Sequence, residues 1–417
     1  MRQWMVAAKK ADFYAIAEKF HVDPVVARII RNREVIGEKN IRIYLGGNLS
    51  DLSDPHQMKD MDRLVEILAQ KIRKQVRIRI IGDYDVDGVT SSHLFLTALR
   101  RVGAKVDVVI PHRIQDGYGL SLHLLQQAKE DGVDTILTCD NGIAAIDEIA
   151  WAKAQKMTVL VTDHHAVPFE EHEGRRTEKK SLADAVVNPH QQDCGYPYKE
   201  LCGAGVAWNV IRVLYENYDM DKREAEDLLD FVAMATVCDV MSLTGENRIL
   251  VKEGLKRIRH TKNIGLQALM QACNVQPENI SAYHFGYVLG PCVNATGRLD
   301  TARHALRLFE TGQETEAEEI ARDLVDLNQE RKELTLQGVE MAKKLCEEGG
   351  YENDPVLVLF LPDVHESIAG LIAGRIREMY NRPVFVLTRG EEGVKGSGRS
   401  TENYSICLLY TSPSPRD

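Results

Sequence analysis

Alternation of strand-like and helix-like segments limits the possible folds of this chain more than any other feature. Apolar, β-branched runs recur about every 25 residues at 77–82, 106–111, 134–139, 157–162 and 183–188. Amphipathic segments such as SSHLFLTALRRV and SLHLLQQAKED lie between most of them. Strand, helix and strand in succession are typical of parallel βαβ units. We therefore predict an α/β fold with a doubly wound parallel sheet in this part of the chain.

Polar residues follow four of the predicted strands directly. The segments are DYDVDG (83–88), DNG (140–142), DHH (163–165) and NPH (188–190). Ligands of open parallel sheets bind just beyond the carboxyl ends of the strands. We therefore expect these carboxylates, imidazoles and amides to lie along one rim of the sheet.

The first of these segments has the D-x-D-x-D-G pattern with which a calcium-binding EF-hand loop begins. Such a loop needs a bidentate Glu at its twelfth position, and counting from Asp83 that position holds Leu94. An EF-hand loop also lies between two helices, whereas this segment follows the strand-like run KQVRIRII. Both observations exclude a calcium sensor.

Carboxylates at alternate positions in a loop can instead converge on Mg²⁺ or Mn²⁺, which prefer oxygen ligands with some imidazole. Any single aspartate of this kind is more often a helix cap or a turn residue. Several at successive strand ends would repel one another unless cations neutralise them. Thr90 or Ser91 is expected to cap the helix that follows, and Gly88 to allow a tight exit from the loop. The candidate metal ligands are Asp83, Asp85, Asp87, Asp140, His164 and Asp239.

The rest of the chain divides by pattern into further regions. Residues 1–70 are predicted to be a helical region, 71–240 the α/β core, and 241–350 a helical region that ends in a long connecting helix. The apolar stripe of that helix is predicted to include Ile320, Leu324, Leu327, Leu334, Met341 and Leu345. A second, smaller α/β domain begins at 351 and continues to 406, with strand PVLVLFLP, helix HESIAGLIAGRIREMY and strand RPVFVLT. Residues 407–417, CLLYTSPSPRD, have the pattern of a translated sequencing adapter and are interpreted as a non-native tail that cuts the second domain short.

Composition and charge limit the class of protein. A net charge of −10 argues against a protein that coats nucleic acid through bulk positive charge, although it allows a local basic track. No apolar run approaches the roughly 20 residues that a membrane-spanning helix needs, and the N-terminus lacks a signal-peptide pattern. The eight cysteines include no C-x-x-C pair. We therefore expect a cytoplasmic protein with reduced thiols and no membrane contact.

Four ordered motifs, GDYDVDG, TCDNGI, VTDHH and TVCDV, resemble the motifs of the DHH phosphoesterase family. The segments HRIQDGYGLS, LCGAGVAW, GENRILV, LGPCVNATGRLD, HESIAGLIAGRI and KGSGRS are similar to those of the single-stranded-DNA-specific exonucleases within that family. The resemblance implies an enzyme that hydrolyses single-stranded DNA from its 5′ end to 5′-mononucleotides in DNA repair and recombination. It also implies two Mn²⁺ or Mg²⁺ ions, a monomer, and a single-stranded-DNA-binding protein and a helicase as partners.

Roles for individual residues follow from the same resemblance. The six candidate ligands would hold the two ions, with Asp140 and His165 as catalytic residues and His165 beside the phosphate. The KGSGRS segment alone is typical of a flexible basic turn, although its glycines and cations can also cradle a phosphate. The residues expected to bind the DNA are Arg113, Arg298, Arg375, Lys395, Ser397 and Arg399.

Two alternatives remain open on the sequence alone. One is a phosphoesterase of the same family that acts on small substrates such as short oligonucleotides, cyclic dinucleotides or pyrophosphate. Such relatives typically begin with a histidine ahead of a shorter aspartate pair, and here the strand residues RIIG occupy that position. The other is a non-catalytic member that binds partners in replication complexes after losing its ligands, and in this chain no ligand position is lost.

Overall fold

The computed structural model describes residues 9–113, 116–117, 119–172, 175–299, 301–351, 354–390 and 393–406. The interpreted adapter tail at 407–417 lies outside the described residues. Within the described part of the chain, no helix combines the length and the hydropathy that crossing a bilayer requires.

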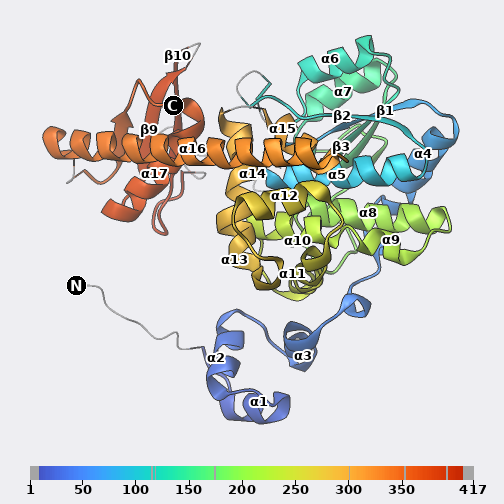
Figure 1. Cartoon of the computed structure of the whole chain (residues 1–417), viewed down its shortest axis with the longest axis horizontal. Coiled ribbons are helices and arrows are strands. Elements are labelled where there is room, and N and C mark those ends of the chain that lie inside the picture. Colours follow the sequence, from blue (N-terminus) through green and yellow to red (C-terminus); the bar gives the residue numbers. More distant parts are fainter. Residues whose placement is uncertain are drawn as a thin grey trace.

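A five-stranded parallel sheet forms the centre of the larger body (Figure 1). Its spatial order is β2-β1-β3-β4-β7, with every neighbouring pair parallel. The predicted α/β fold with a parallel sheet is therefore confirmed, and each of the five predicted strands is present. The strands are β1 (Arg77–Ile81), β2 (Lys105–Val109), β3 (Thr135–Cys139), β4 (Thr158–Thr162) and β7 (Ala185–Val187).

Both faces of this sheet are buried because successive side chains point to opposite sides. Ile80 and Leu137 belong to the largest hydrophobic cluster, whereas Ile81 and Ile136, one position away, belong to a second cluster on the other face. Helices α6 and α7 cover that second face, and α4, α5 and α8 cover the first (Figure 1). These helices are α4 (Met61–Arg73), α5 (Val86–Arg101), α6 (Leu122–Glu130), α7 (Ile146–Ala154) and α8 (Gly203–Asn217).

The strand order reverses direction at β1, since β2 lies on one side of it and β3 on the other. The helices that follow β1 and β3 leave on opposite faces, which opens a crevice beyond the carboxyl ends of these two strands. The sequence segments 82–88 and 140–142 lie at this point. A small two-stranded ribbon, β5 (Phe169–His172) and β6 (Arg175–Glu178), interrupts the chain between β4 and β7.

A group of helices packs against the first face of the sheet and shares its hydrophobic cluster, which extends from Met58 to Leu324. The predicted regions 71–240 and 241–350 are thus joined by one core. The helices are α9 (Lys222–Glu226), α10 (Leu229–Cys238), α11 (Gly245–Arg257), α12 (Ile264–Ala272), α13 (Ala282–His284), α14 (Gly290–Leu299) and α15 (Ala302–Glu310). Between them lie the short turns η3 (Ile258–His260) and η4 (Pro277–Asn279), and a π-helical turn η5 (Phe285–Leu289).

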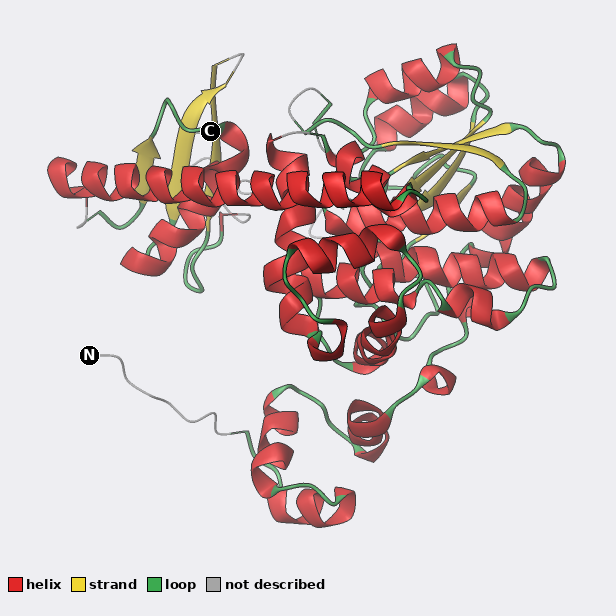
Figure 2. Cartoon of the chain, viewed as in Figure 1, coloured by secondary structure: helices red, strands yellow, loops and turns green. Residues whose placement is uncertain are grey.

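The long connecting helix is α16 (Glu314–Gly349), which extends from the larger body to the smaller unit (Figures 1 and 2). Gly350 caps it with a positive φ of 68°. The predicted apolar stripe is only partly correct. Ile320 and Leu324 are buried, but Met341 is 50% exposed, and Val339, Ala342 and Cys346 form the buried face of the second half instead.

The smaller unit contains a three-stranded sheet in the order β10-β9-β8, covered by α17 and α16. Its elements are β8 (Leu357–Phe360), α17 (Glu366–Tyr380), β9 (Val384–Gly390) and β10 (Gly393–Arg399). The KGSGRS segment has a pattern typical of a flexible turn, but its first five residues, 395–399, lie in β10 and pair with β9. The turn interpretation was wrong because strand pairing outweighs the low strand propensity of its two glycines.

The N-terminal helices form a small cluster of their own, built on Ile30, Val35, Ile41 and Tyr44. Residue 70, where the sequence pattern predicts a boundary, falls inside α4, whose buried face packs into the core of the larger body. The elements ahead of α4 are α1 (Phe13–Phe20), α2 (Pro24–Asn32), α3 (Glu38–Gly46), η1 (Leu49–Asp51) and η2 (Pro55–Gln57).

Candidate metal centre and anion-binding hollow

The loop after β1 turns sharply into α5 and carries three of the candidate aspartates. Asp85 caps the helix, because its Oδ1 accepts a 3.0 Å hydrogen bond from the amide of Gly88. The prediction of Thr90 or Ser91 as the cap was therefore wrong. The Thr90 hydroxyl donates instead to the Val86 carbonyl at 2.7 Å, and the Ser91 hydroxyl donates to Asp87 Oδ1 at 3.5 Å. A Cβ at Gly88 would lie 2.4 Å from the carbonyl oxygen of Asp83, so this tight exit requires a glycine.

Asp87 is held by the N-terminus of another helix. Its two carboxylate oxygens accept hydrogen bonds of 2.6 Å from the Gly203 amide and 2.7 Å from the Ala204 amide, in the first turn of α8. A helix N-terminus favours negative charge because its first N–H groups are unpaired and its dipole is positive there. This role of LCGAGVAW was not predicted, because its only signal in the sequence is a pair of glycines at the start of a helix.

Asp140 follows β3 in a left-handed conformation with φ of 62°. Its amide donates to the Thr162 carbonyl at 3.1 Å, which ties it to the end of the neighbouring strand β4. The next residue, Asn141, donates its side-chain amide to the carbonyls of Ile81 and Cys139, so it joins the ends of β1 and β3. Asp140 is thus fixed at the crevice that the sheet topology opens.

In the DHH segment, the aspartate organises the two histidines. The Oδ1 of Asp163 accepts hydrogen bonds from the amides of His164 and His165 and from His165 Nδ1, the last at 2.8 Å. That hydrogen bond raises the pKa of His165 to about 8, although burial acts in the opposite direction. Asn188, from the NPH segment, donates to the His165 carbonyl at 2.9 Å. Asp163 and Asn188 therefore hold His164 and His165 in position through hydrogen bonds.

Asp239 comes from outside the sheet, as the C-terminal cap of α10. With it, the six candidate ligands come together in one place. His164 Nε2 lies 3.0 Å from Asp140 Oδ1, 3.6 Å from Asp239 Oδ2 and 3.7 Å from Asp87 Oδ2. Ligand atoms of three overlapping sets lie within 4.8 Å of one another: Asp87, His164 and Asp239; Asp83, Asp85 and Asp140; and Asp140, His164 and His165.

Burial and crowding disfavour the charged form of these carboxylates. Burial, followed by the charge of Asp85, raises the pKa of Asp83 to about 8, and burial with the charge of Asp87 raises that of Asp239 to about 8. The pKa of Asp140 is also raised by burial and by its aspartate neighbours. Burial lowers the pKa of His164, which leaves a neutral imidazole. Cations in the cluster would reverse the shifts of the carboxylates.

The unpaired polar atoms of the cluster fit metal ions. Asp83 Oδ1, Asp140 Oδ1, His164 Nε2 and Asp239 Oδ2 are each buried and without a hydrogen-bond partner within the described residues. A buried carboxylate oxygen without a partner is costly. Four such atoms that converge, three of them oxygens and one an imidazole nitrogen, match the donor preference of Mg²⁺ or Mn²⁺.

A basic hollow adjoins the loop after β1. The Arg113 guanidinium lies over the ring of Tyr84 at 4.7 Å from its centroid, and Tyr84 stands between Asp83 and Asp85. The basic hollow consists of two neighbouring spaces of about 220 and 180 Å³, and Arg113 lines both of them. Arg298 lines the first and donates to the Ser367 carbonyl at 2.7 Å. Burial, followed by the charge of Arg113, lowers the pKa of Arg298 to about 10, so an anion here would be stabilised.

The remaining predicted DNA-binding residues lie on β10 and α17. Lys395 lines the second hollow, where Glu366 lies 3.1 Å from its ammonium group. Ser397 and Arg399 share a face of β10 with Lys395 and point at α17, since a Cβ at Gly370 would lie within 2.8 Å of both side chains. Arg375 lies on the exposed side of α17 and lines neither hollow. Glu366 was missed by the sequence analysis.

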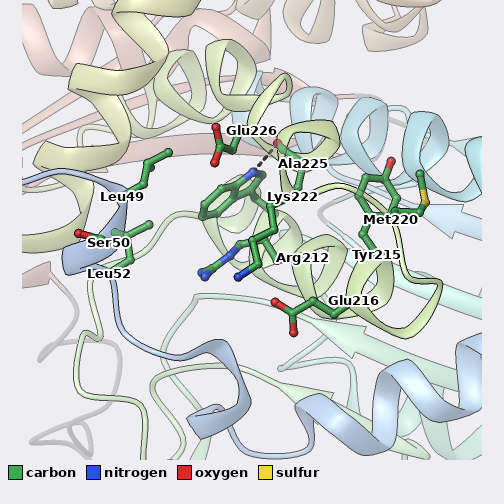
Figure 3. Close-up of a pocket in the computed structure, with 11 residues that line it drawn as sticks. Leu49, Ser50, Leu52, Arg212, Tyr215, Glu216, Met220, Lys222, Ala225 and Glu226 are labelled. Atoms are coloured by element: carbon green, nitrogen blue, oxygen red, sulfur yellow. Dashed lines mark hydrogen bonds between the residues drawn. The ribbon is translucent and has the colours of Figure 1, made fainter.

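Figure 3 shows a separate cavity of about 350 Å³. Arg212, Tyr215 and Glu216 line it from the C-terminal half of α8, whereas the carboxylate cluster lies at the N-terminus of that helix. Leu49 and Leu52 close it from the N-terminal segment. This cavity is therefore distinct from the cluster.

Comparison with known proteins agrees with this geometry. The model for "DHH family, N-terminal domain" matches residues 77–236. A crystal structure of the exonuclease RecJ bound to manganese superposes with a TM-score of 0.72 at 32% identity, over 84% of this chain and 85% of the other. The chain belongs to the RecJ family. Its RecJ relatives include the single-stranded-DNA-specific exonucleases RecJ of Haemophilus influenzae, 36% identical, and of Bacillus subtilis, 33% identical.

These alignments cover 91% and 94% of this chain. The chain spans 66% of the length of the Haemophilus RecJ and 48% of that of the Bacillus RecJ. The family match at residues 77–236 contains the five-stranded sheet and five of the six candidate ligands, all except Asp239.

Proposed function

We propose that this chain carries the catalytic part of a two-metal exonuclease, which hydrolyses single-stranded DNA from the 5′ end and releases 5′-mononucleotides in DNA repair and recombination. The observation that carries this proposal is the convergence of five aspartates and His164 on one crevice, with four of their buried atoms unpaired. The similarity to the RecJ exonucleases supports the substrate class.

The six candidate ligands would hold two Mn²⁺ or Mg²⁺ ions. Such a pair of ions supplies an activated water and stabilises the attacking and leaving oxygens of a phosphodiester. The hydrogen bond to Asp163 raises the pKa of His165 and fixes the orientation of its imidazole. His165 would therefore contact the scissile phosphate. The carboxylate of Asp140 would lie between two sets of ligands, because Asp140 belongs both to the set with Asp83 and Asp85 and to the set with His164 and His165.

The basic hollow would set the polarity of the reaction. Arg113 and Arg298 face a small space beside the loop that holds Asp83 and Asp85. A terminal 5′ phosphate bound there would present the next phosphodiester to the cluster. Lys395, Ser397 and Arg399 would add contacts from β10, as the resemblance implies. Arg375 is the least supported of the predicted set, because it lines neither hollow.

The proposal includes a monomeric enzyme in the cytoplasm that works with a single-stranded-DNA-binding protein and a helicase. Support for these partners comes only from the similarity to RecJ exonucleases. Size-exclusion chromatography and affinity capture with each purified partner test this part separately from the chemistry.

A nuclease assay with single and double strands, labelled at either the 5′ or the 3′ end, tests the proposal. We expect Mn²⁺-dependent release of mononucleotides from the 5′ end of single strands, and no release by the variant Asp140→Ala. Cleavage of cyclic dinucleotides with no action on single strands would instead identify a small-substrate phosphoesterase. Binding of DNA without hydrolysis under any metal would identify a non-catalytic member.

A further inference from the structure

Two tyrosines lie stacked on the surface of the larger body. The ring centroids of Tyr283 and Tyr287 are 5.1 Å apart, with 24° between the ring planes. The residues are 62% and 72% exposed. Single exposed aromatic residues are common, but a stacked pair is a contiguous apolar surface, and such a surface is suited to a planar, apolar ligand.

The local backbone builds this pair. Tyr283 lies in α13, and Tyr287 lies in the π-helical turn η5 that follows it. The two residues are four positions apart and so share one face, whereas Phe285 and Leu289 are fully buried on the opposite face. π-Helical turns within helices occur frequently at functional sites.

This segment is fixed to the last turn of α10, directly ahead of the candidate ligand Asp239. The thiol of Cys238 donates to the Phe285 carbonyl at 3.3 Å. A Cβ at Gly290 would lie 2.3 Å from Cys238 Sγ, so α14 starts in close contact with the same turn. The segment that carries the stacked tyrosines is therefore packed against the residue that precedes Asp239.

The other end of the same helical run reaches the loop after β1. In α14, the Oδ1 of Asn294 accepts a 3.1 Å hydrogen bond from the Val86 amide, and a Cβ at Gly297 would lie 2.3 Å from the Tyr84 carbonyl oxygen. The run then ends at Leu299, directly after Arg298, which lines the basic hollow. From Tyr287 to Arg298 the helix axis rises by about 16 Å, which a few nucleotides can span.

Val240 adds a further observation beside the cluster. It directly follows Asp239, has a φ of 58° and is 87% exposed. A left-handed conformation is unfavourable for a β-branched residue, and such strain is concentrated at functional sites. An apolar side chain is thus held in solvent next to a candidate metal ligand.

We propose that Tyr283 and Tyr287 form a base-stacking platform for the single strand, on the 3′ side of the scissile phosphate. This inference rests on the proposed function, because the 5′ phosphate in the basic hollow sets the direction in which the strand leaves. Stacking on an aromatic face accepts every base and requires that the bases be unpaired. The platform therefore contributes selection of single strands without sequence preference.

Binding measurements with two kinds of strand test the platform. The double variant Tyr283→Ala/Tyr287→Ala is made in the Asp140→Ala background, so that no strand is degraded. Affinity is measured for a 5′-phosphorylated oligothymidylate and for an abasic strand of the same length. We expect the double variant to lose affinity for the base-containing strand by about 5- to 150-fold per stacked base, with no change for the abasic strand.

Three controls accompany this measurement. The variant Tyr283→Phe/Tyr287→Phe keeps the rings and should bind like the parent. Tyr14→Ala removes a tyrosine that is 78% exposed on α1 and should change neither affinity. Thermal unfolding should be unaffected in all of them, because the substituted rings face solvent, and the single variants Tyr283→Ala and Tyr287→Ala repeat the test if the double variant is unstable.

The outcomes separate this inference from the proposed function. If the protein degrades single strands but the alanine variants bind both strands like the parent, the platform is wrong and the proposed function stands. If the protein degrades no DNA, the proposed function fails. The binding data then still show whether Tyr283 and Tyr287 stack on the bases of a single strand. Equal losses of affinity for the base-containing and the abasic strand would also contradict the stacking platform, since they would indicate a contact to the DNA backbone.

Discussion

Gly203 and Asp140 are in such close contact that a side chain at position 203 would displace the carboxylate. A Cβ built on Gly203 would lie 2.6 Å from Asp140 Cβ and 2.8 Å from Asp140 Oδ1. The amide of the same glycine donates to Asp87 at 2.6 Å. The N-terminus of α8 therefore positions two candidate ligands at once, and only glycine permits this approach.

The variant Gly203→Ala should lose activity with only a moderate loss of stability. Overpacking at this contact should cost about 1–3 kcal/mol, and a displaced Asp140 should reduce kcat/KM on single-stranded DNA about 100-fold. Gly205→Ala is the matched control in the same helical turn, where the nearest atoms to the new Cβ belong to the flexible Leu201 side chain, at 3.3 Å and beyond. Equal activities of the two variants would show that the contact does not position the ligand.

The variant Asp163→Asn should weaken metal binding although Asp163 is not one of the six candidate ligands. The asparagine cannot accept all the hydrogen bonds that Asp163 receives from His164, His165 and Ile143. Residues that orient metal ligands typically contribute about 10- to 100-fold in metal affinity or activity. Titration calorimetry with Mn²⁺ measures the affinity, and an unchanged dissociation constant together with unchanged activity would contradict this role.

Arg298 and Arg375 should differ in their effect on the 5′ phosphate. Arg298→Gln should lower kcat/KM by about 10- to 100-fold on a 5′-phosphorylated strand, and much less on a 5′-hydroxyl strand, because Arg298 lines the hollow and is mostly buried. Arg375→Gln is the control on the exposed side of α17 and should leave the ratio of the two substrates unchanged. A larger effect of Arg375 would move the phosphate site to the outer face of that helix.

Asp230, far along α10 from Asp239, should make stability depend on pH. Burial raises its pKa to about 6, although the Thr261 hydroxyl and the Phe231 amide donate hydrogen bonds to its carboxylate. The folded state therefore binds the proton of the Asp230 carboxyl more tightly than the unfolded state does. The resulting contribution to folding stability is fully present below the ordinary pKa of 3.8 and is lost as the pH rises through about 6.

Between pH 4 and 7 the folded state should lose about 2 kcal/mol through this one group. The variant Asp230→Asn should lack that part of the pH dependence, so its stability relative to the parent should increase from pH 4 to pH 7. Urea denaturation at several pH values measures the difference. A difference that stays constant with pH would show that Asp230 is ionised in the folded protein.

Much of the sheet could be predicted from the sequence because its signals are local. Each strand is a short apolar run, and a parallel sheet delivers the residue after each strand to one rim. Asp83, Asp140 and His164 could therefore be placed together without knowledge of any contact. The two interpretations of Asp85, as a helix cap or as a metal ligand, proved compatible, since one carboxylate oxygen caps α5 while the residue lies in the cluster.

Features that depend on tertiary contacts could not be predicted. The support of Asp87 by Gly203 joins positions 116 residues apart, and nothing in either segment indicates the other. The strand β10 contains glycines that favour a turn, and it is formed by pairing with β9. Met341 fits the helical period of α16, but the partner helix α17 packs against a different face.

The central claim is that six side chains from four separate segments hold two metal ions. Anomalous diffraction from crystals grown with Mn²⁺ tests it most directly. We predict two peaks, roughly 3.5–4 Å apart, among Asp83, Asp85, Asp87, Asp140, His164 and Asp239, and the loss of both in Asp140→Ala. An absence of peaks in this cluster, or peaks only at other positions, would contradict the claim.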